Sequence, residues 1–313
     1  MQLIRGLINL KHQKQACVAT IGNFDGVHSG HRAIVDRVLA KAKLLGLPSC
    51  VLLFEPHPKE FFMKEQCPPR LACFKEKYQR LKKLGIDKLV VLQFNQPLRE
   101  MEAEKFVHQV LIDKLQVKHL VVGDDFHFGH RRKGNFQLLE QLSTNQYTLE
   151  PTPSVLVDGQ RVSSTLIREA LANQALDLAE SYLGHRFSMT GRVGYGEQLG
   201  RQIKFPTANV AIKRRKLPVS GVYLVKCHWQ QGGKKYSAWG AANCGKRPTV
   251  NGLDYRLEVH LLGVSPELYG IELAVDFYAP IRAEKKFESL DALKAQINKD
   301  IEQAELLIEK IES

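Results

Sequence analysis

The chain has 313 residues, of which 44% are hydrophobic and 8% aromatic, enough for one large core or two moderate ones, and the usual domain size favours two. Lys and Arg number 45 against 33 Asp and Glu, and the resulting charge of +12 favours anionic partners: nucleic acid, acidic membranes or phosphorylated small molecules. The start, MQLIRGLINLKHQKQ, lacks the features of a signal peptide, and no apolar run approaches the roughly 20 residues that span a bilayer. We therefore expect a soluble, cytoplasmic protein without a membrane partner.

Cysteine spacing and charge distribution argue against several other roles. The six cysteines form no Cys-x-x-Cys pair, and several lie in apolar runs such as PSCVLLF, as small buried hydrophobes do. The basic residues are scattered, with short clusters at 130–133 and 213–216, and no aromatic residues interleave them as stacking platforms for bases. We expect no disulfide, no structural zinc and no nucleic-acid partner.

The first half of the chain alternates apolar β-type runs with amphipathic helical stretches. Runs that are apolar on both faces and separated by helices predict a parallel sheet covered on both sides. Ligands of such sheets bind outside the carboxyl ends of the strands, where this chain reads GNFDGVHSGH, FEPHP and VGDDFHFG. The predicted strands are 16–22, 49–54, 88–94 and 119–123, and the predicted helices are 31–45, 74–84 and 103–115.

The segment GNFDGVHSGHRAI (22–34) places two histidines, His28 and His31, between the first predicted strand and the first predicted helix. A helix N-terminus offers unpaired N–H groups and the positive end of the dipole, so a glycine-bearing turn there suits a phosphate. Imidazoles can donate hydrogen bonds to phosphate oxygens and can carry charge near neutral pH. The spacing of a P-loop is absent, so the pattern indicates another nucleotide-binding fold.

The sequence pattern changes from helical to strand-like near residues 183–186, after the helical stretches SSTLIREALAN and ALDLAESYLG. Glycine-rich turns then separate GVYLVKCHW, YSAWGAANCG, YRLEVHLLG and ELAVDFYAPI, which predicts antiparallel strands in a closed barrel. The chain ends in a predicted amphipathic helix that packs on this barrel. Its apolar stripe comprises Leu290, Leu293, Ile297, Ile301, Ala304 and Ile308.

Two motifs together carry a family resemblance. His28 to His31 resembles the H-x-G-H signature of the nucleotidyltransferase superfamily, and SSTLIR (163–168) resembles its second signature. The whole chain then resembles the bacterial bifunctional riboflavin kinases/FMN adenylyltransferases, or FAD synthetases. GNFDGVHSGH, FEPHP, VGDDFHFG and RVSSTLIR match the first module of that family, and GR…FPTAN, GVYLV, NCGKRPTV, LEVHLLG and IRAEKKFES match the second.

The resemblance implies a fold and two activities. Residues 1–183 would form a Rossmann-like FMN adenylyltransferase domain with a parallel sheet. Residues 187–313 would form an antiparallel β-barrel riboflavin kinase domain with a C-terminal helix. ATP would phosphorylate riboflavin to FMN, and a second ATP would adenylylate FMN to FAD with release of pyrophosphate. ATP, riboflavin and FMN are thus the implied small-molecule substrates, and the oligomeric state stays open.

In the first module the resemblance makes His28 and His31 catalytic residues that bind the ATP phosphates. It assigns the departing pyrophosphate to Ser164, Thr165 and Arg168. Phe54, Pro56, Pro58 and Phe62 would form an apolar wall for the flavin ring, although ordinary core and turn positions explain them almost as well. The remaining ATP or FMN contacts implied are Gly22, Phe24, Asp25, Gly30, Asp125 and Arg161.

In the second module Thr207 and Asn209 of FPTAN present oxygens of the type that Mg²⁺ prefers, and the resemblance makes them its ligands. Glu258 alternates with the apolar Leu257 and Val259, so it points away from the apolar face. Taken alone it is more typical of a solvated strand carboxylate, but the resemblance makes it the base that accepts the riboflavin hydroxyl proton. Gly200, Arg201 and Pro206 are the further nucleotide-binding residues implied for this module.

One departure from the family pattern keeps alternatives open. Lys204 stands where glycine usually precedes FPTAN, and lysine disfavours a positive φ there but also adds a charge near the phosphates. A nucleotidyltransferase whose β-domain only binds ligand is therefore one rival reading. The charge of +12 motivates another, a basic nucleic-acid-binding protein with a relic nucleotide fold.

Overall fold

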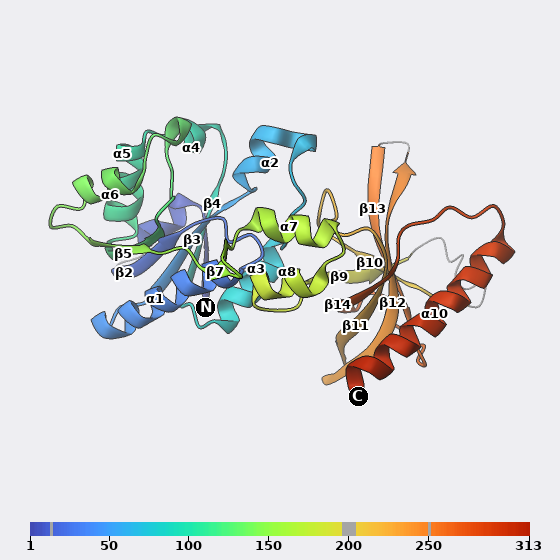
Figure 1. The fold of residues 1–313 in the computed structure, drawn as a ribbon. Helices are drawn as coiled ribbons and strands as arrows, with labels where there is room; N and C mark the ends of the chain where they lie inside the picture. The colour runs from blue at the N-terminus through green and yellow to red at the C-terminus, as the bar shows by residue number, and fades with distance from the viewer. Residues whose placement is uncertain (13–14, 196–204, 250–251) are drawn as a thin grey trace. The chain divides into compact units, whose positions relative to one another are not determined.

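The computed structural model describes residues 1–12, 15–195, 205–249 and 252–313 (Figure 1). The chain forms two compact units. The first comprises Met1–Pro68 and Phe74–Ser164, and the second comprises Pro69–Cys73 and Thr165–Ser313.

The first unit is built on a six-stranded, all-parallel sheet in the order β1-β4-β3-β2-β5-β6. The four strands predicted from apolar runs are present, so the predicted parallel sheet is confirmed. The two edge strands, β1 and β6, were not predicted, because each has a single buried residue and a largely polar sequence. The strands are β1 (Gln2–Arg5), β2 (Cys17–Ile21), β3 (Ser49–Glu55), β4 (Lys88–Gln93), β5 (Val117–Gly123) and β6 (Thr148–Thr152).

Helices cover both faces of this sheet. Successive residues of β3 point to opposite sides, so Val51 and Leu53 join a core with α1 and α3, while Cys50 and Leu52 join a core with η3 and α6. The three predicted helices are confirmed as α1, α3 and α5 with η3. The helical segments are η1 (Leu7–His12), α1 (Ser29–Leu45), α2 (Pro58–Met63), η2 (Lys64–Gln66), α3 (Phe74–Lys83), α4 (Gln96–Glu100), α5 (Ala103–Phe106), η3 (Val107–Lys114), η4 (His130–Arg132) and α6 (Phe136–Leu142).

The order of the strands fixes where a ligand would enter the first unit. From β2 the chain moves outward through β3 to β4, and it then returns to place β5 on the other side of β2. Loops that leave β2 and β5 therefore diverge at the carboxyl edge of the sheet, the position where sheets of this kind bind ligands. The segments after these two strands are 22–28, which precedes α1, and 124–129. Beyond β6 lies a small hairpin, β7 (Leu156–Val157) with β8 (Gln160–Arg161).

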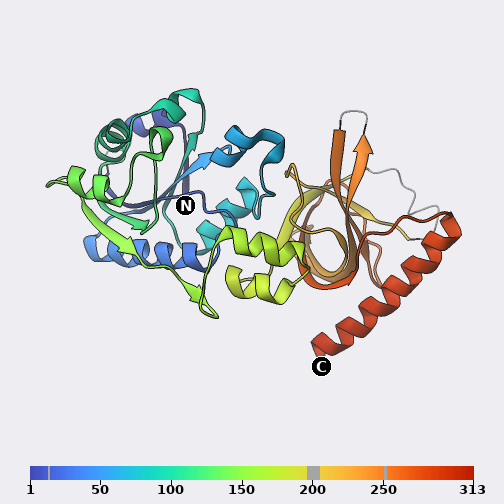
Figure 2. The same ribbon diagram turned by 45° about the horizontal axis from the view of Figure 1, so that its top comes forward.

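The second unit is a closed antiparallel barrel in the order β10-β13-β12-β11-β14-β9, in which β9 also pairs with β10 (Figure 2). The predicted barrel is confirmed. Helices α7 (Ser164–Ala172) and α8 (Leu176–Leu183) precede it. The strands are β9 (Ser188–Gly194), β10 (Ala208–Ala211), β11 (Gly221–Gln231), β12 (Lys234–Thr249), β13 (Gly252–Leu261) and β14 (Glu272–Arg282).

The C-terminal helix α10 (Leu290–Glu312) packs on the barrel, as predicted. Arg282 of β14 donates from Nε to both carboxylate oxygens of Asp300, at 2.8 and 3.0 Å. Trp239 of β12 donates to Glu312 at 2.8 Å. Ala304 is buried, but Leu290 is 60% exposed because it lies at the first residue of the helix, so its inclusion in the packed stripe was wrong.

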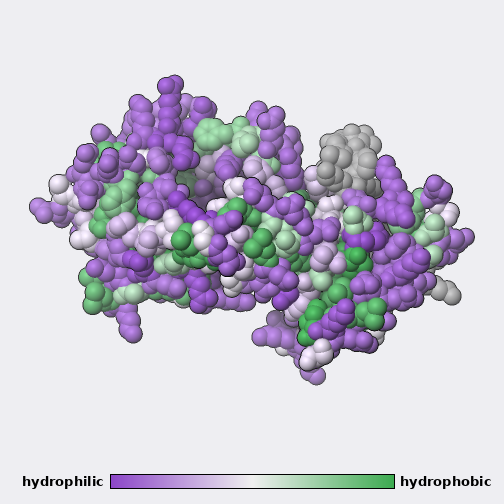
Figure 3. All heavy atoms as spheres, viewed as in Figure 1, coloured by the Kyte–Doolittle hydropathy of each residue, from purple (hydrophilic) through white to green (hydrophobic). Residues whose placement is uncertain are grey.

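The face drawn in Figure 3 is mainly hydrophilic and carries hydrophobic residues only in small patches. Across the described residues, no helix combines the length and apolarity needed to cross a membrane.

A polar cluster around buried His119 in the first unit predicts a loss of stability in mild acid. His119 of β5 contacts Thr148 at 2.6 Å and Glu150 at 3.1 Å, and Arg37 donates to Glu150 at 2.6 Å. Burial lowers the pKa of His119 despite the carboxylate beside it. Burial alone would raise the pKa of Glu150, but its bonds to Arg37 and His119 outweigh this and lower it.

Because the folded pKa of His119 lies below 6.5, the unfolded chain takes up a proton first as the pH falls through 6.5. We expect the free energy of unfolding to decrease from there toward the lower folded pKa. A His119→Gln variant keeps an amide for Thr148 and Glu150 but cannot titrate. Urea unfolding of the first unit between pH 7.5 and 5.5 checks this, and an equal decrease in parent and variant would contradict it.

Candidate active sites

Two stacked histidines begin helix α1. The imidazole of His28 caps the helix, because its Nδ1 accepts from the backbone N–H of His31 at 3.3 Å. The two rings lie face to face with centroids 3.6 Å apart, and Phe24 packs against His31 at 4.9 Å. His28 is buried, and Phe24 lies wholly within the core. The structure therefore brings the two predicted histidines together at the carboxyl edge of the sheet.

Hydrogen bonding and burial set the protonation of this pair. Neutral His28 carries its proton on Nε2, because Nδ1 is used as the acceptor of the cap. Burial lowers the pKa of His31 well below 6.5, and the charges of His28 and Lys77 lower it further. His31 is therefore a neutral hydrogen-bond donor at pH 7. Its Nδ1 is buried and meets no hydrogen-bond partner among the described residues, so the Nε2–H tautomer costs least.

The loop before α1 is held in a strained backbone shape. Phe24 and Val27 have φ of +49° and +48°, a region that bulky side chains rarely adopt, and both side chains are buried. A Cβ on Gly30 would lie 3.2 Å from the His28 ring, so glycine lets that ring lie over the first turn of α1. A Cβ on Gly22 would meet the Phe24 ring at 3.0 Å. The glycines thus leave room for the two rings that shape the loop.

The second predicted signature opens helix α7. Ser164 donates from its hydroxyl to the backbone oxygen of Asp25 at 3.0 Å, so α7 starts directly beside the histidine loop. Asp25 is buried, and Thr165 is exposed. Arg168 lies one turn further along α7 in the second unit, where its Nε donates to the backbone oxygen of Pro69 at 2.6 Å.

Asp125 and Arg161 form an ion pair after β5. The guanidinium Nη2 of Arg161 lies 2.9 Å from Asp125 and 3.1 Å from Asp124. The side chains of Arg161 and Asp124 are about half exposed, and that of Asp125 is 68% exposed. Sequence reasoning missed Asp124, although it adjoins Asp125 in the VGDDFHFG motif.

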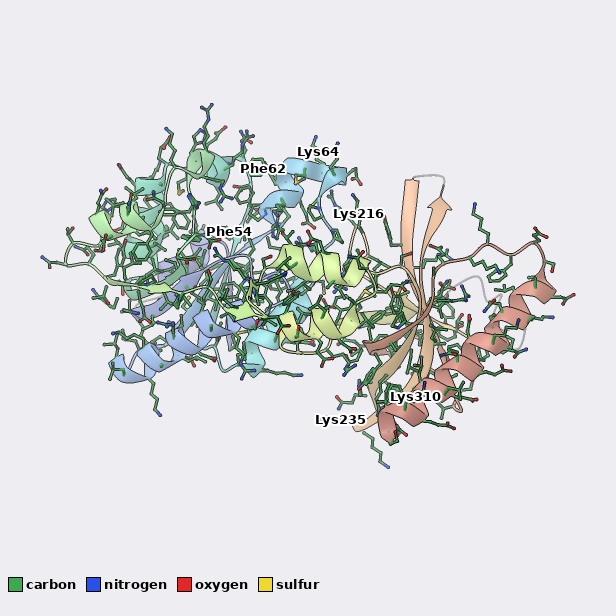
Figure 4. The ribbon with its side chains drawn as sticks, in the orientation of Figure 1. Phe54, Phe62, Lys64, Lys216, Lys235 and Lys310 are labelled. Atoms are coloured by element: carbon green, nitrogen blue, oxygen red, sulfur yellow. The ribbon has the colours of Figure 1, made fainter. Side chains whose placement is uncertain are left out.

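Aromatic rings gather beyond β3 (Figure 4). Phe54 is half-buried at the end of β3, whereas Phe62 lies on α2 and is 55% exposed. Phe94 contacts both, with centroids 6.1 Å from Phe54 and 5.7 Å from Phe62, and Phe61 lies 5.4 Å from Phe94. Pro58 begins α2, and Pro56 follows a cis peptide bond after Glu55. Phe61 and Phe94 were not predicted, since only the fold brings FEPHPKEFF and LQFN together.

On the barrel, Glu258 faces outward from β13. Its neighbours Leu257 and Val259 are buried in the barrel interior, which confirms the predicted alternation. Asn209 of β10 and Asn243 of β12 lie opposite Glu258 on either side. Residues directly opposite in antiparallel strands share a face, with Cβ atoms roughly 5 Å apart. Arg256 lies 3.5 Å from the Glu258 carboxylate. Asn243 was not predicted, because its register with Glu258 arises only in the folded barrel.

The barrel also holds a cavity of about 200 Å³, lined by none of the side chains of Asn209, Asn243 and Glu258. Pro206 and Thr207 line it together with Val259 of β13 and Tyr269. Tyr195 stacks on Tyr269 with centroids 4.3 Å apart, and His260 contacts the backbone oxygen of Pro206 at 2.9 Å. Gly200 and Arg201, together with Lys204, lie outside the described residues.

Comparison with known proteins connects each half of the chain to one activity. The family model for FAD synthetase matches residues 10–166, and the one for riboflavin kinase matches residues 183–308. The bifunctional riboflavin kinase/FMN adenylyltransferase of Pseudomonas fluorescens is 49% identical over 310 residues, with 98% of each chain covered. That of Escherichia coli K12 is 45% identical, with 96% of each chain covered.

A solved structure has the same fold. The crystal structure of a macrolide-efflux protein from Streptococcus pneumoniae matches with a TM-score of 0.80 at 26% identity, covering 97% of this chain and 99% of that one. With two matching family models and full-length relatives that share nearly half of its residues, the chain belongs to the bifunctional riboflavin kinase/FMN adenylyltransferase family.

Proposed function

We propose that this chain carries out two consecutive ATP-dependent steps of flavin cofactor synthesis, the kinase step in residues 187–313 and the adenylylation step in residues 1–183. In the first step the 5′-hydroxyl oxygen of riboflavin attacks the γ-phosphorus of ATP, giving FMN and ADP. In the second a phosphate oxygen of FMN attacks the α-phosphorus of ATP, giving FAD and pyrophosphate. The stacked His28 and His31 pair at the start of α1 is the observation that carries the second step.

In adenylyl transfer, positioning and charge stabilisation dominate, because the attacking FMN phosphate is already anionic and needs no strong base. His28 and His31 donate from Nε2 to the ATP phosphates beside the N–H groups that open α1. Ser164, Thr165 and Arg168 hold the departing pyrophosphate. The other proposed ATP or FMN contacts are Gly22, Phe24, Asp25, Gly30, Asp125 and Arg161.

The aromatic cluster after β3 is the proposed wall for the flavin ring. The exposed ring of Phe62 and the half-buried ring of Phe54 offer apolar surface of the kind that a planar heterocycle stacks on. The guanidinium of Arg99 lies over the Phe62 ring, 5.4 Å from the ring centroid. This contact limits the motion of the ring. Pro56 and Pro58 limit the motion of the segment that carries Phe62.

In the kinase step Glu258 is the proposed general base that accepts the hydroxyl proton of riboflavin. Asn209 lies directly opposite Glu258 in the pairing of β10 with β13, so the two side chains share one face of the barrel. They can therefore contact the same bound ligand. Pro206 and Thr207 line the cavity of about 200 Å³, which supports their role as ATP contacts. Gly200 and Arg201 complete the proposed nucleotide site.

Mg²⁺ fits the oxygen donors of this site. Within the described residues, no three His, Cys, Asp or Glu side chains cluster as a ready metal site. Mg²⁺ is commonly held by few protein oxygens together with phosphates and water. The Thr207 hydroxyl and the Asn209 amide oxygen, next to Glu258, suit that mode. When bound, the ion would neutralise charge on the transferring phosphate.

We also propose that the protein works in the cytoplasm. All six cysteines are buried free thiols, a state that agrees with the reducing environment of the cytoplasm.

One incubation tests the bifunctional assignment against its rivals. Pure protein is mixed with riboflavin, ATP and Mg²⁺, and the flavins are resolved by chromatography. We expect FMN and FAD. FAD formed only from supplied FMN would make the barrel a binding module. No flavin product, together with salt-sensitive binding to RNA or DNA, would favour the nucleic-acid-binding alternative.

A further inference from the structure

The first unit contains a buried lysine, Lys77, to which the proposed mechanism gives no role. Lys77 of α3 is only 1% exposed, and a lysine is rarely buried unless its charge is paired. Its ammonium donates to the backbone oxygen of Asn23 at 3.3 Å and lies 3.6 Å from the carboxylate of Glu55. Asn23 belongs to the loop that ends at His28, and Glu55 is the last residue of β3.

We propose that Lys77 is a positioning residue for adenylyl transfer, because its buried ammonium fixes the histidine loop against the end of β3. This inference rests on the proposed role of His31. Phe24 and Val27 of this loop have a positive φ, which costs free energy. Contacts from outside the loop, such as the hydrogen bond from Lys77 to Asn23, are therefore needed to hold its shape. Glu55 also adjoins the segment with Phe61 and Phe62, so one ammonium connects the phosphate loop and the proposed flavin wall.

Lys77 also acts on His31 through its charge. The charged groups that act on His31 are His28 and Lys77 of α3, and the Lys77 ammonium lies 3.6 Å from the Glu55 carboxylate. Asp25 is a further buried titratable group, in the loop before α1. A buried cation beside His31 disfavours a second positive charge there, and the orphaned Nδ1 would bury an unpaired N–H if it were protonated. Burial is the main cause of the lowered pKa of His31, and the charge of Lys77 adds to the preference for a neutral Nε2–H donor.

The test compares Lys77→Met with Lys77→Met/Glu55→Gln, which removes the charge of the ion-pair partner together with that of the lysine. We expect kcat for FMN adenylylation to fall on the order of 10²-fold in both, as misplaced catalytic groups cause. The acid limb of the pH profile should move to higher pH, because His31 then protonates more easily. Riboflavin kinase activity of the same chain should stay within about twofold, since Lys77 lies in the other unit. Lys82→Met, an exposed lysine of the same helix, should match the parent.

Three outcomes would overturn the proposal. The first is a folded variant with the parent rate of FAD formation. The second is a lost rate with an unmoved acid limb, which would make Lys77 merely structural. The third is a double variant that keeps kinase activity but loses the folded first unit, which would assign Lys77 to folding alone. His31→Ala is measured beside them: if that variant makes FAD at the parent rate, the proposed role of His31 fails instead.

Discussion

Replacing His31 with alanine should slow FAD formation from FMN and ATP by roughly 10²-fold or more, the usual effect of removing a preorganised donor to a charged transition state. FMN should accumulate when riboflavin is the starting substrate, because the barrel still phosphorylates it. His31 is a neutral donor in this structure, so the loss reflects a hydrogen bond rather than a positive charge. Flavin chromatography over time measures both products.

Two further substitutions identify the nitrogen involved. Gln places its amide nitrogen near the position of Nε2, and Asn places it near Nδ1. Because Nδ1 is buried and Nε2 is the proposed donor, His31→Gln should retain more FAD synthesis than His31→Asn. His108→Ala removes an exposed histidine of the same unit and should match the parent. Parent-like FAD synthesis by His31→Ala, or a better rate for Asn than for Gln, would contradict the assigned geometry.

The sequence predicted the central elements of both units, because those elements repeat an apolar pattern. Val51 and Leu53 face one side of the sheet, and Cys50 and Leu52 face the other, so β3 reads as a continuous apolar run. The edge strand β6 was not predicted, because only one of its five residues is buried and its sequence, TLEPT, includes a proline. The apolar pattern of a sequence therefore identifies the buried central strands of a sheet and misses the edge strands, which bury few residues.

The site residues also differ in how far the sequence could predict them. His28 and His31 lie within one short motif, so local spacing was enough to place them together. Lys77, Phe94 and Asn243 come from distant segments, and their proximity to a site depends on packing or strand register. A lysine in an amphipathic helix is normally read as a solvated charge. Only the structure shows that Lys77 is buried.

Leu290 shows the opposite error. The helical period is correct along α10, and Ala304 is buried as that period predicts. Leu290 is nevertheless exposed, because the first residue of the helix lies before the turns that contact the barrel. Periodicity gives the face of a helix but not how far along its length the partner surface extends.

Replacing Glu258 with glutamine should separate the two activities. The substitution keeps the size of the side chain and removes its basic oxygen, so riboflavin phosphorylation should fall by about 10² to 10⁴, the usual contribution of a general base. Asn209 and Asn243 flank the position and can still hydrogen-bond an amide, so the barrel should stay folded. The measurement is the rate of FMN formation from riboflavin, ATP and Mg²⁺.

Supplied FMN bypasses the kinase step and provides the internal control for Glu258→Gln. The variant should convert FMN and ATP to FAD at close to the parent rate, because the carboxylate of β13 takes no part in adenylyl transfer. Glu305→Gln removes an exposed carboxylate of α10 and should leave both rates unchanged. A matching loss of both activities in folded Glu258→Gln would mean that the two steps depend on one site. If neither activity fell, Glu258 would be an ordinary solvated strand residue and the kinase base would lie elsewhere on the barrel.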